Sequence, residues 1–280
     1  MTVEQWIELS AQFDVDGLEF YSGFTPCDEP NVLKRLRNII EAQNRSVPMM
    51  CHSPDFTRPS REERQQEIER QKKVICATAT LGGRYCRVLS GQRRPDISRA
   101  NGMKWVQECI LDLLPFAERQ GVVLILENHY KDGFWNYPEF AQKLTDFLEL
   151  LDGIPDSSWF GVNYDPSNAI IAGDDPIRLL ELVKHRVRTM HASDRYFQGG
   201  TLEDLHRMED LAQTGYASIL KHGIIGRGLN DYDQIFSILA GVGFKGWVSI
   251  EDGPDPATGV HDIAESARFL RKKMAQHGLK

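Results

Sequence analysis

The 280-residue chain lacks the features that would assign it to a membrane, to nucleic acid or to secretion. No apolar run reaches the roughly 18 residues that a membrane-spanning helix needs. The N-terminal residues have neither the basic nor the apolar region of a signal peptide. No block of five or more basic residues occurs and the net charge is −7, which argues against nucleic acid as the main partner.

Cysteine is also scarce. The five cysteines are odd in number and contain no Cys-x-x-Cys pair, so we expect reduced thiols in a cytoplasmic protein. Cys51 precedes His52, which leaves two interpretations of Cys51, a reactive thiol or a small buried apolar residue. The rest of the composition, 41% hydrophobic and 26% charged, is that of a soluble globular protein with a core that needs no disulfides.

Strand-like and helix-like segments alternate along the whole chain, which predicts a parallel sheet with helices outside it. We expect strands at 15–21, 47–52, 84–89, 122–127, 160–165, 187–193 and 247–251. We expect helices at 2–12, 31–44, 60–80, 101–120, 138–151, 176–185, 231–241 and 259–276, with an irregular insertion at 194–228 that contains a helix near 201–221. No repeat, low-complexity tract or linker divides the chain, so residues 1–280 are expected to form one domain.

Four of these strands end in side chains that bind divalent metals: Glu127, Asp165, His191 and Glu251. In a (β/α)8 barrel the C-terminal ends of the strands meet at one mouth, so distant residues come together there. Three carboxylates and one imidazole form a mostly hard donor set that suits Mn2+, Mg2+, Co2+ or Zn2+. A helix N-cap or a salt bridge at the rim is the alternative for each residue taken alone, whereas all four together favour a metal site.

The residues around these four positions carry a more specific signal. They are Leu126-Glu127-Asn128, the turn from Asn163 to Asn168, His191-Ala-Ser-Asp194, Gly226-Arg-Gly228 and the strand from Gly246 to Glu251. On these motifs nearly the whole chain resembles the xylose-isomerase-like family of sugar isomerases and epimerases, which fold as TIM barrels. The resemblance implies that Glu127, Asp165, His191 and Glu251 bind one divalent cation. It also implies that Glu127 and Glu251 are catalytic, flanking the substrate and moving protons.

The expected fold is therefore an α/β (β/α)8 TIM barrel that lacks its first strand or has it truncated. We count seven strands rather than eight, and the chain opens on a helix. Either the barrel is open at that edge or the start codon was chosen too late. An open edge would have to be covered or paired.

Five further residues are candidates for binding the substrate. His52 would hydrogen-bond a hydroxyl or be structural, and Asn168 would bind a hydroxyl where many relatives have His. Asp194 would orient a ligand or a bound water. Arg227 would meet a phosphate or carboxylate, or lie on the surface. Trp135 belongs to an aromatic loop that would form an apolar wall for a sugar or pack on the rim.

The resemblance and the donor set favour a divalent-metal-dependent isomerase or epimerase of a keto-sugar, sugar phosphate or related polyol. A cation acting as Lewis acid would stabilise an ene-diolate, while carboxylates on either face of the carbon move the proton. A dehydratase of a keto-inositol starts with the same step and is the alternative. An endonuclease IV-like DNA repair enzyme needs several metals and many more His and Glu ligands, whereas this chain has eight His residues, of which His185, His206 and His222 are expected on helices or in the insertion, and an acidic balance. A non-catalytic sugar-binding protein is the last option. A homodimer, formed through outer helices or the insertion, is also expected.

Overall fold

The structure is a computed structural model that describes residues 1–209, 219–251, 255 and 257–279, apart from the side chains of residues 205, 206, 208 and 209. Two compact units emerge from the contacts within the chain. The first contains Met1–Glu127 and Glu149–Gly161, and the second contains Asn128–Leu148 and Val162–Lys280. Among the described residues, no helix is both long and apolar enough to span a membrane.

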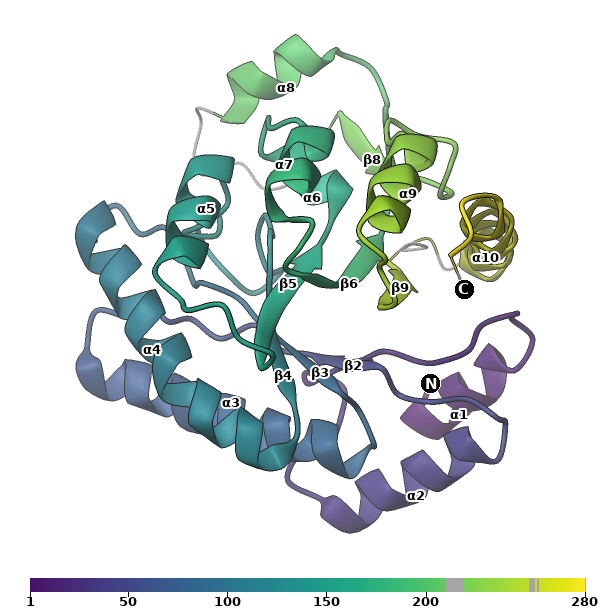
Figure 1. Cartoon of the computed structure of the whole chain (residues 1–280), viewed down its shortest axis with the longest axis horizontal. Helices are drawn as coiled ribbons and strands as arrows, with labels where there is room; N and C mark the ends of the chain where they lie inside the picture. The colour runs from purple at the N-terminus through teal and green to yellow at the C-terminus, as the bar shows by residue number, and fades with distance from the viewer. Residues whose placement is uncertain (210–218, 252–254, 256, 280) are drawn as a thin grey trace. The chain divides into compact units, whose positions relative to one another are not determined.

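The first unit is built on four parallel strands that follow one another in chain order (Figure 1). They are β1 (Phe20–Tyr21), β2 (Met49–Cys51), β3 (Tyr85–Val88) and β4 (Val123–Glu127). Every residue of β2 and β4 is buried, which explains why these strands are continuous apolar runs rather than alternating ones. Met49, Cys51, Val123 and Ile125 form a core cluster, against which Tyr21, Tyr85 and Trp159 pack.

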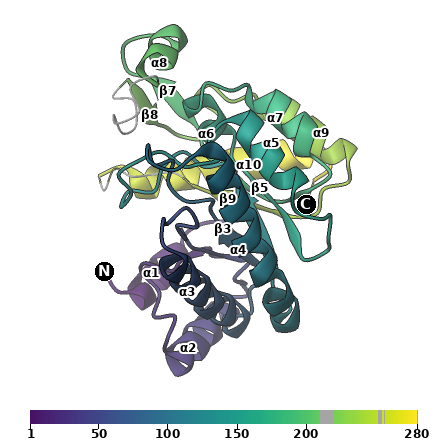
Figure 2. The ribbon, with the colours of Figure 1, turned by 90° about the vertical axis from the view of Figure 1, so that its left-hand side faces the viewer.

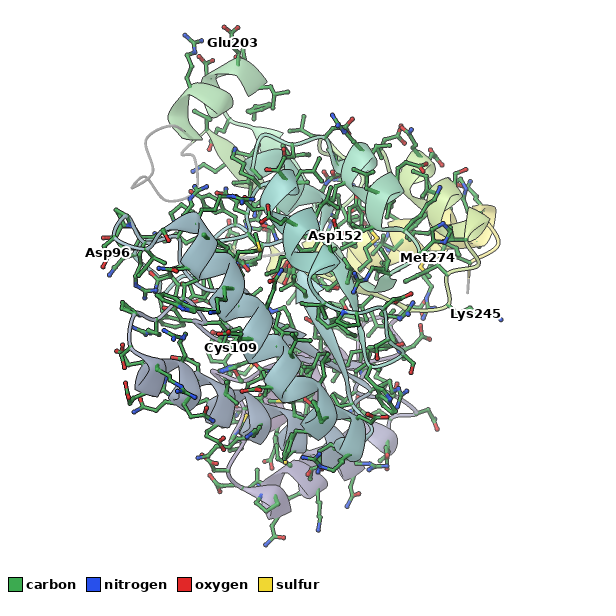
Figure 3. All side chains as sticks on the ribbon, turned by 60° about the vertical axis from the view of Figure 1, so that its left-hand side comes forward. Asp96, Cys109, Asp152, Glu203, Lys245 and Met274 are labelled. Carbon is green, nitrogen blue, oxygen red and sulfur yellow. The ribbon has the colours of Figure 1, made fainter. Side chains whose placement is uncertain are left out.

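The helices of the first unit are α1 (Val3–Ser10), α2 (Pro30–Glu41), α3 (Arg61–Thr80) and α4 (Arg99–Gln120). Their starts follow local sequence: Ser60 and Ser98 cap α3 and α4 by accepting backbone N–H bonds. Gly121 ends α4 with φ of 70°, a left-handed conformation that glycine adopts readily. α3 packs against α4, which runs across the foreground of Figure 3 with Cys109 buried on it.

The second unit contains β6 (Val187–Ala192) between two parallel neighbours, β5 (Phe160–Tyr164) and β9 (Trp247–Ile250). The boundary between the units falls within β5 and within α5 (Leu144–Asp152). The other helices of this unit are α6 (Pro166–Ile171), α7 (Pro176–Val183), α8 (Leu202–Glu209), α9 (Tyr232–Gly241) and α10 (Gly259–Gln276). An antiparallel ribbon of β7 (Arg195–Phe197) and β8 (Leu220–His222) lies with α8 at one end of this unit (Figure 2).

The expected elements are largely present, although the strand expected at 15–21 covers only Phe20–Tyr21. The chain opens on α1 and carries seven parallel strands among its described residues, as expected. The expected helix at 138–151 begins only at Leu144, whose N–H donates to the Asp174 carboxylate at 2.7 Å. The helix expected near 201–221 is present as α8 over Leu202–Glu209 and is wrong at 220–221, which belong to the strand β8; residues 210–218 lie outside the described part.

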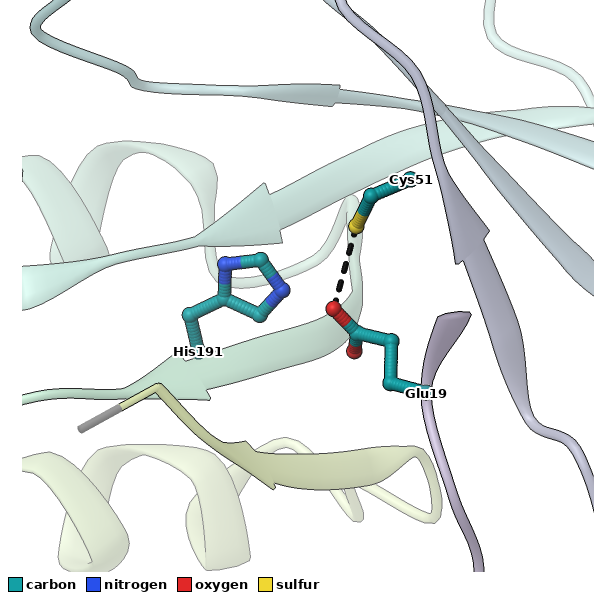
Figure 4. Close-up of side chains that lie close together, drawn as sticks. All are labelled: Glu19, Cys51 and His191. Carbon is teal, nitrogen blue, oxygen red and sulfur yellow. Dashed lines mark hydrogen bonds between the residues drawn. The ribbon is translucent and has the colours of Figure 1, made fainter. Parts of the chain in front are cut away.

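The cysteines are free thiols, as the odd count and spacing indicate. Burial raises the pKa of the Cys86 and Cys109 thiols to about 12, so neither is ionised near neutral pH. Cys51 is buried too, but it is more than an apolar filler. Its thiol donates a hydrogen bond to the Glu19 carboxylate at 3.0 Å (Figure 4).

Candidate functional site

Three of the expected metal ligands lie together at strand ends of the second unit. Asp165 follows β5, His191 is on β6 and Glu251 follows β9. A ligand atom of each lies within 4.8 Å of a ligand atom of the other two, and Nδ1 of His191 is 3.2 Å from Oε2 of Glu251. Asp165 and His191 are buried, whereas the Glu251 side chain is 46% exposed. The triad is therefore open to solvent on its Glu251 side.

Asp165 is also the N-cap of the short helix α6. A helix N-cap was the alternative to metal binding for each of the four residues taken alone. Its Oδ1 accepts bonds from the backbone N–H groups of Ser167 and Asn168 at 2.7 and 3.0 Å. The Ser193 hydroxyl donates to the same oxygen at 2.9 Å, and the Asn168 amide donates to Oδ2 at 2.9 Å. Capping and metal binding are compatible, because these donors fix the carboxylate in one orientation.

Asn128 fixes the backbone of the same residue. Its Nδ2 donates to the Asp165 carbonyl at 2.6 Å, and its Oδ1 accepts from the Asp165 N–H at 2.9 Å. Because successive side chains of an extended segment point different ways, at most one of Asn128 and His129 can face the site. His129 instead lies with Nδ1 3.2 Å from the buried Glu139 carboxylate.

Asp194 organises the loop that precedes α9. Its carboxylate accepts four backbone N–H bonds of 2.9–3.2 Å, from Arg195, Gly226, Gly228 and Asn230. Through its amide, Asn230 then donates to the Ser167 hydroxyl and to the Ser193 carbonyl, at 3.1 and 3.0 Å. The loop is thus tied to the two serines that neighbour Asp165 in the hydrogen-bond network.

Glu127 ends β4 in the first unit and is held by an arginine that was not among the expected site residues. Nη1 of Arg87, on β3, lies 2.6 Å from Oε2 of Glu127, and both side chains are buried. Arg87 also donates to the Ser53 hydroxyl at 3.2 Å and to the His52 carbonyl at 3.4 Å. The sequence does indicate that Arg87 has a buried partner, although not which one, because an arginine inside an apolar strand needs such a partner.

His52 follows β2 and has its own partner in the first unit. Its Nδ1 lies 2.7 Å from the Ser22 hydroxyl, which follows β1. Whichever of the two atoms donates, this bond orients the His52 ring. Ser22 and Glu19, the polar residues on either side of β1, were not predicted as site residues, because a two-residue strand has little periodic pattern.

The remaining candidates occupy different surroundings. Asn168 contacts Asp165 and is buried. Trp135 is buried, while the neighbouring Phe134 is 84% exposed on the same loop. Arg227 is exposed and pairs with Glu265 at 3.0 Å, an arrangement that fits the surface alternative for this residue.

Comparisons with known proteins agree on the fold. The model of the family described as "Xylose isomerase-like TIM barrel" matches residues 7–273. An inosose dehydratase of Bacillus thuringiensis (strain Al Hakam) is 25% identical over 162 residues, which are 56% of this chain and 50% of that protein. The chain thus spans about half the length of the curated relatives that it matches.

Two solved structures are similar over nearly the whole chain. A D-tagatose 3-epimerase-like protein has a TM-score of 0.79 at 17% identity, covering 99% of this chain and 95% of that one. The IolI protein with a binding zinc atom has a TM-score of 0.75 at 16% identity, covering 99% and 93%. The match of the family model over almost all residues decides the assignment, and the chain belongs to the xylose isomerase-like TIM barrel family.

Proposed function

We propose that this protein is a divalent-metal-dependent isomerase or epimerase of a keto-sugar, a sugar phosphate or a related polyol. The observation that carries the proposal is the cluster of Asp165, His191 and Glu251 at neighbouring strand ends. Acidic and imidazole groups that gather at the C-terminal ends of barrel strands are typical of a binding and catalytic site. Similar solved structures include an L-ribulose 3-epimerase and a D-tagatose 3-epimerase-like protein, which supports this reaction class.

The donor chemistry of the triad fits a divalent metal. Two carboxylates and one imidazole suit Zn2+, Mn2+, Co2+ or Mg2+, and the similar IolI protein binds a zinc atom. We assign Asp165, His191 and Glu251 as ligands together with Glu127, whose neighbour Asn128 is bonded to Asp165. When bound, the cation would act as a Lewis acid that stabilises negative charge on adjacent substrate oxygens.

The side chains of the protein would then divide the remaining work. Glu127 and Glu251 move the proton, one removing it from carbon and the other returning it on the opposite face. Asn168 binds a substrate hydroxyl through its amide, but its amide does not titrate and cannot relay a proton near neutral pH. His52 is a hydrogen-bonding group for a second hydroxyl, oriented by Ser22.

A dehydratase of a keto-inositol is the second candidate, and a specific observation favours it. Curated relatives that match the sequence are named inosose dehydratases. Both reactions begin when a base removes a proton next to a carbonyl, and they differ in whether a hydroxyl then leaves. The same triad therefore serves either reaction.

A screen in D2O tests the proposal and separates the two candidates. The protein, loaded with Mn2+ or Zn2+, is incubated with keto-sugars, their phosphates and keto-inositols, and the products are followed by NMR and mass spectrometry. Deuterium at one carbon with a new diastereomer indicates an epimerase, and loss of water with an unsaturated ketone indicates a dehydratase. Absence of both exchange and dehydration across the panel contradicts the proposal.

We also retain two expectations that follow from the sequence. Residues 1–280 are proposed to act as one catalytic domain, and the protein is proposed to form a homodimer. Light scattering at working concentration measures the second directly, and a monomer there contradicts it.

A further inference from the structure

We propose that Arg87 supplies a permanent positive charge beside Glu127. Its guanidinium positions the Glu127 carboxylate and lowers the affinity of this carboxylate for a divalent metal. The inference rests on the proposed function, because it concerns one of the proposed ligands. All the contacts that carry it lie within the first unit. It assigns Arg87 as a positioning residue rather than a group that touches the reacting atoms.

Arg87 and Glu127 form a short and buried ion pair. Nη1 of Arg87 and Oε2 of Glu127 are 2.6 Å apart, and the two side chains are 5% and 0% exposed. A charge-assisted bond of this length, away from water, is much stronger than a surface ion pair. The Arg87 guanidinium therefore compensates part of the negative charge of Glu127 before a metal cation binds.

Arg87 is itself anchored. Its Nη2 donates to the Ser53 hydroxyl at 3.2 Å and its Nε to the His52 carbonyl at 3.4 Å. Both acceptors lie in the segment that follows β2, and Arg87 stands on the adjacent strand β3. Because the planar guanidinium is held at three points, the position of its Nη1 donor, and with it that of Oε2 of Glu127, is fixed.

The pair also matters to the protein before metal binds. A buried carboxylate without a counter-charge is costly, and acidic groups that gather at one mouth repel one another. Arg87 removes this cost for Glu127, so the carboxylate is oriented in the absence of metal. Arg87 therefore has two opposite effects on metal binding. It positions a ligand before the metal arrives, but its positive charge repels the metal ion.

Two properties of Arg87 can be separated by substitution, its charge and its fork of N–H donors. Arg87→Met removes both, so Mn2+ should bind at least about 10-fold more tightly, because one nearby positive charge opposes a divalent ion by that much even at a dielectric close to that of water. Arg87→Lys keeps the charge but loses the fork, so its Mn2+ affinity should stay near that of the wild type. Turnover should fall in both variants, because neither fixes the orientation of Glu127.

The test is calorimetric titration of Mn2+ into the full chain after metal has been stripped with EDTA. Arg94→Met is the matched control, since it breaks another ion pair of the first unit, in which Arg94 Nη2 lies 2.5 Å from Asp55 Oδ2 and the side chains are 12% and 3% exposed. The control should lose stability and keep the wild-type Mn2+ affinity. Unchanged or weaker Mn2+ binding by Arg87→Met, beside a wild type that binds, overturns the inference and leaves the proposed function intact.

Two other results also test the role of Arg87. If Arg87→Met does not fold without metal, Mn2+ should restore its thermal transition and should not restore that of Arg94→Met to the same extent. Failure of Mn2+ to restore Arg87→Met overturns the inference. If the wild type itself binds no Mn2+, the proposed function fails and the inference fails with it.

Discussion

Asn128 holds Asp165 by two hydrogen bonds to its backbone, donating to its carbonyl at 2.6 Å and accepting from its N–H at 2.9 Å. The Asn128 amide therefore pairs with both backbone groups of Asp165, as a neighbouring strand would, between the end of β5 and the start of α6. It fixes the residue whose side chain caps that helix and stands in the triad. Positioning by such outer contacts is commonly as important for a metal ligand as its own chemistry.

Replacing Asn128 by Ala should lower the affinity for Mn2+ by about 10–100-fold, because Asp165 loses the group that orients its backbone. Isothermal titration measures this. Asn101→Ala, on the exposed first turn of α4, is the control and should leave the affinity unchanged. Equal Mn2+ affinities in wild type and Asn128→Ala would remove Asn128 from the site.

Asp194→Ala should destabilise the protein by about 2–3 kcal/mol or more, because backbone N–H groups that share one buried acceptor lose it together. Urea unfolding measures the change. Asp231→Ala removes only the exposed N-cap of α9 and should cost about 1 kcal/mol. A loss at Asp194 no larger than that at Asp231 would show that the loop does not depend on this carboxylate.

The metal-free protein should lose stability as the pH falls from about 6.5 towards 4, partly through His222. Burial, with a contribution from Arg195, lowers the pKa of His222 from 6.5 to about 4. In that window the unfolded chain binds a proton that the folded chain does not, so acid favours unfolding.

Urea midpoints at about pH 7 and about pH 5 should therefore differ less in His222→Gln than in the wild type. His261→Gln, whose ring is exposed, is the control and should behave like the wild type. The same loss of stability in wild type and His222→Gln would exclude His222 as a source of the acid sensitivity.

Glu127→Gln and Glu251→Gln should each retain metal while turnover falls by about 100-fold or more, because each variant keeps an oxygen ligand and loses a base. The two variants should also differ. One should still exchange substrate hydrogen with D2O without completing the inversion, since the first proton transfer survives. Near-normal turnover in both variants would make His52 the better candidate for the base.

The strands that carry the site were predictable because buried parallel strands are short apolar runs. The run from Val122 to Leu126 ends in the polar Glu127, and the segment from Phe160 to Tyr164 ends at Asp165. Polar residues at such ends face the mouth of a barrel, so their type and position can be read from sequence. The side chains of Asp165, His191 and Glu251 lie close together at these strand ends.

The partners of these residues could not be predicted in the same way. Arg87 and Glu127 are 40 positions apart, and only the tertiary structure brings them together. The helix α6 is a different case, because Asp165 at its N-cap and Pro166 at its first position are a local signal that was present and not used. The ribbon of β7 and β8 gives no such signal, since each strand has three residues and depends on the other.

The most direct test of the account is whether the triad binds a metal. Mn2+ or Zn2+ is titrated into the metal-stripped wild type, Asp165→Ala and His191→Ala, with circular dichroism confirming that each is folded. We predict about one ion per chain for the wild type and a loss of affinity of at least about 10–100-fold in both variants. Folded variants that bind the ion as tightly as the wild type, or a wild type that binds none, would contradict the account.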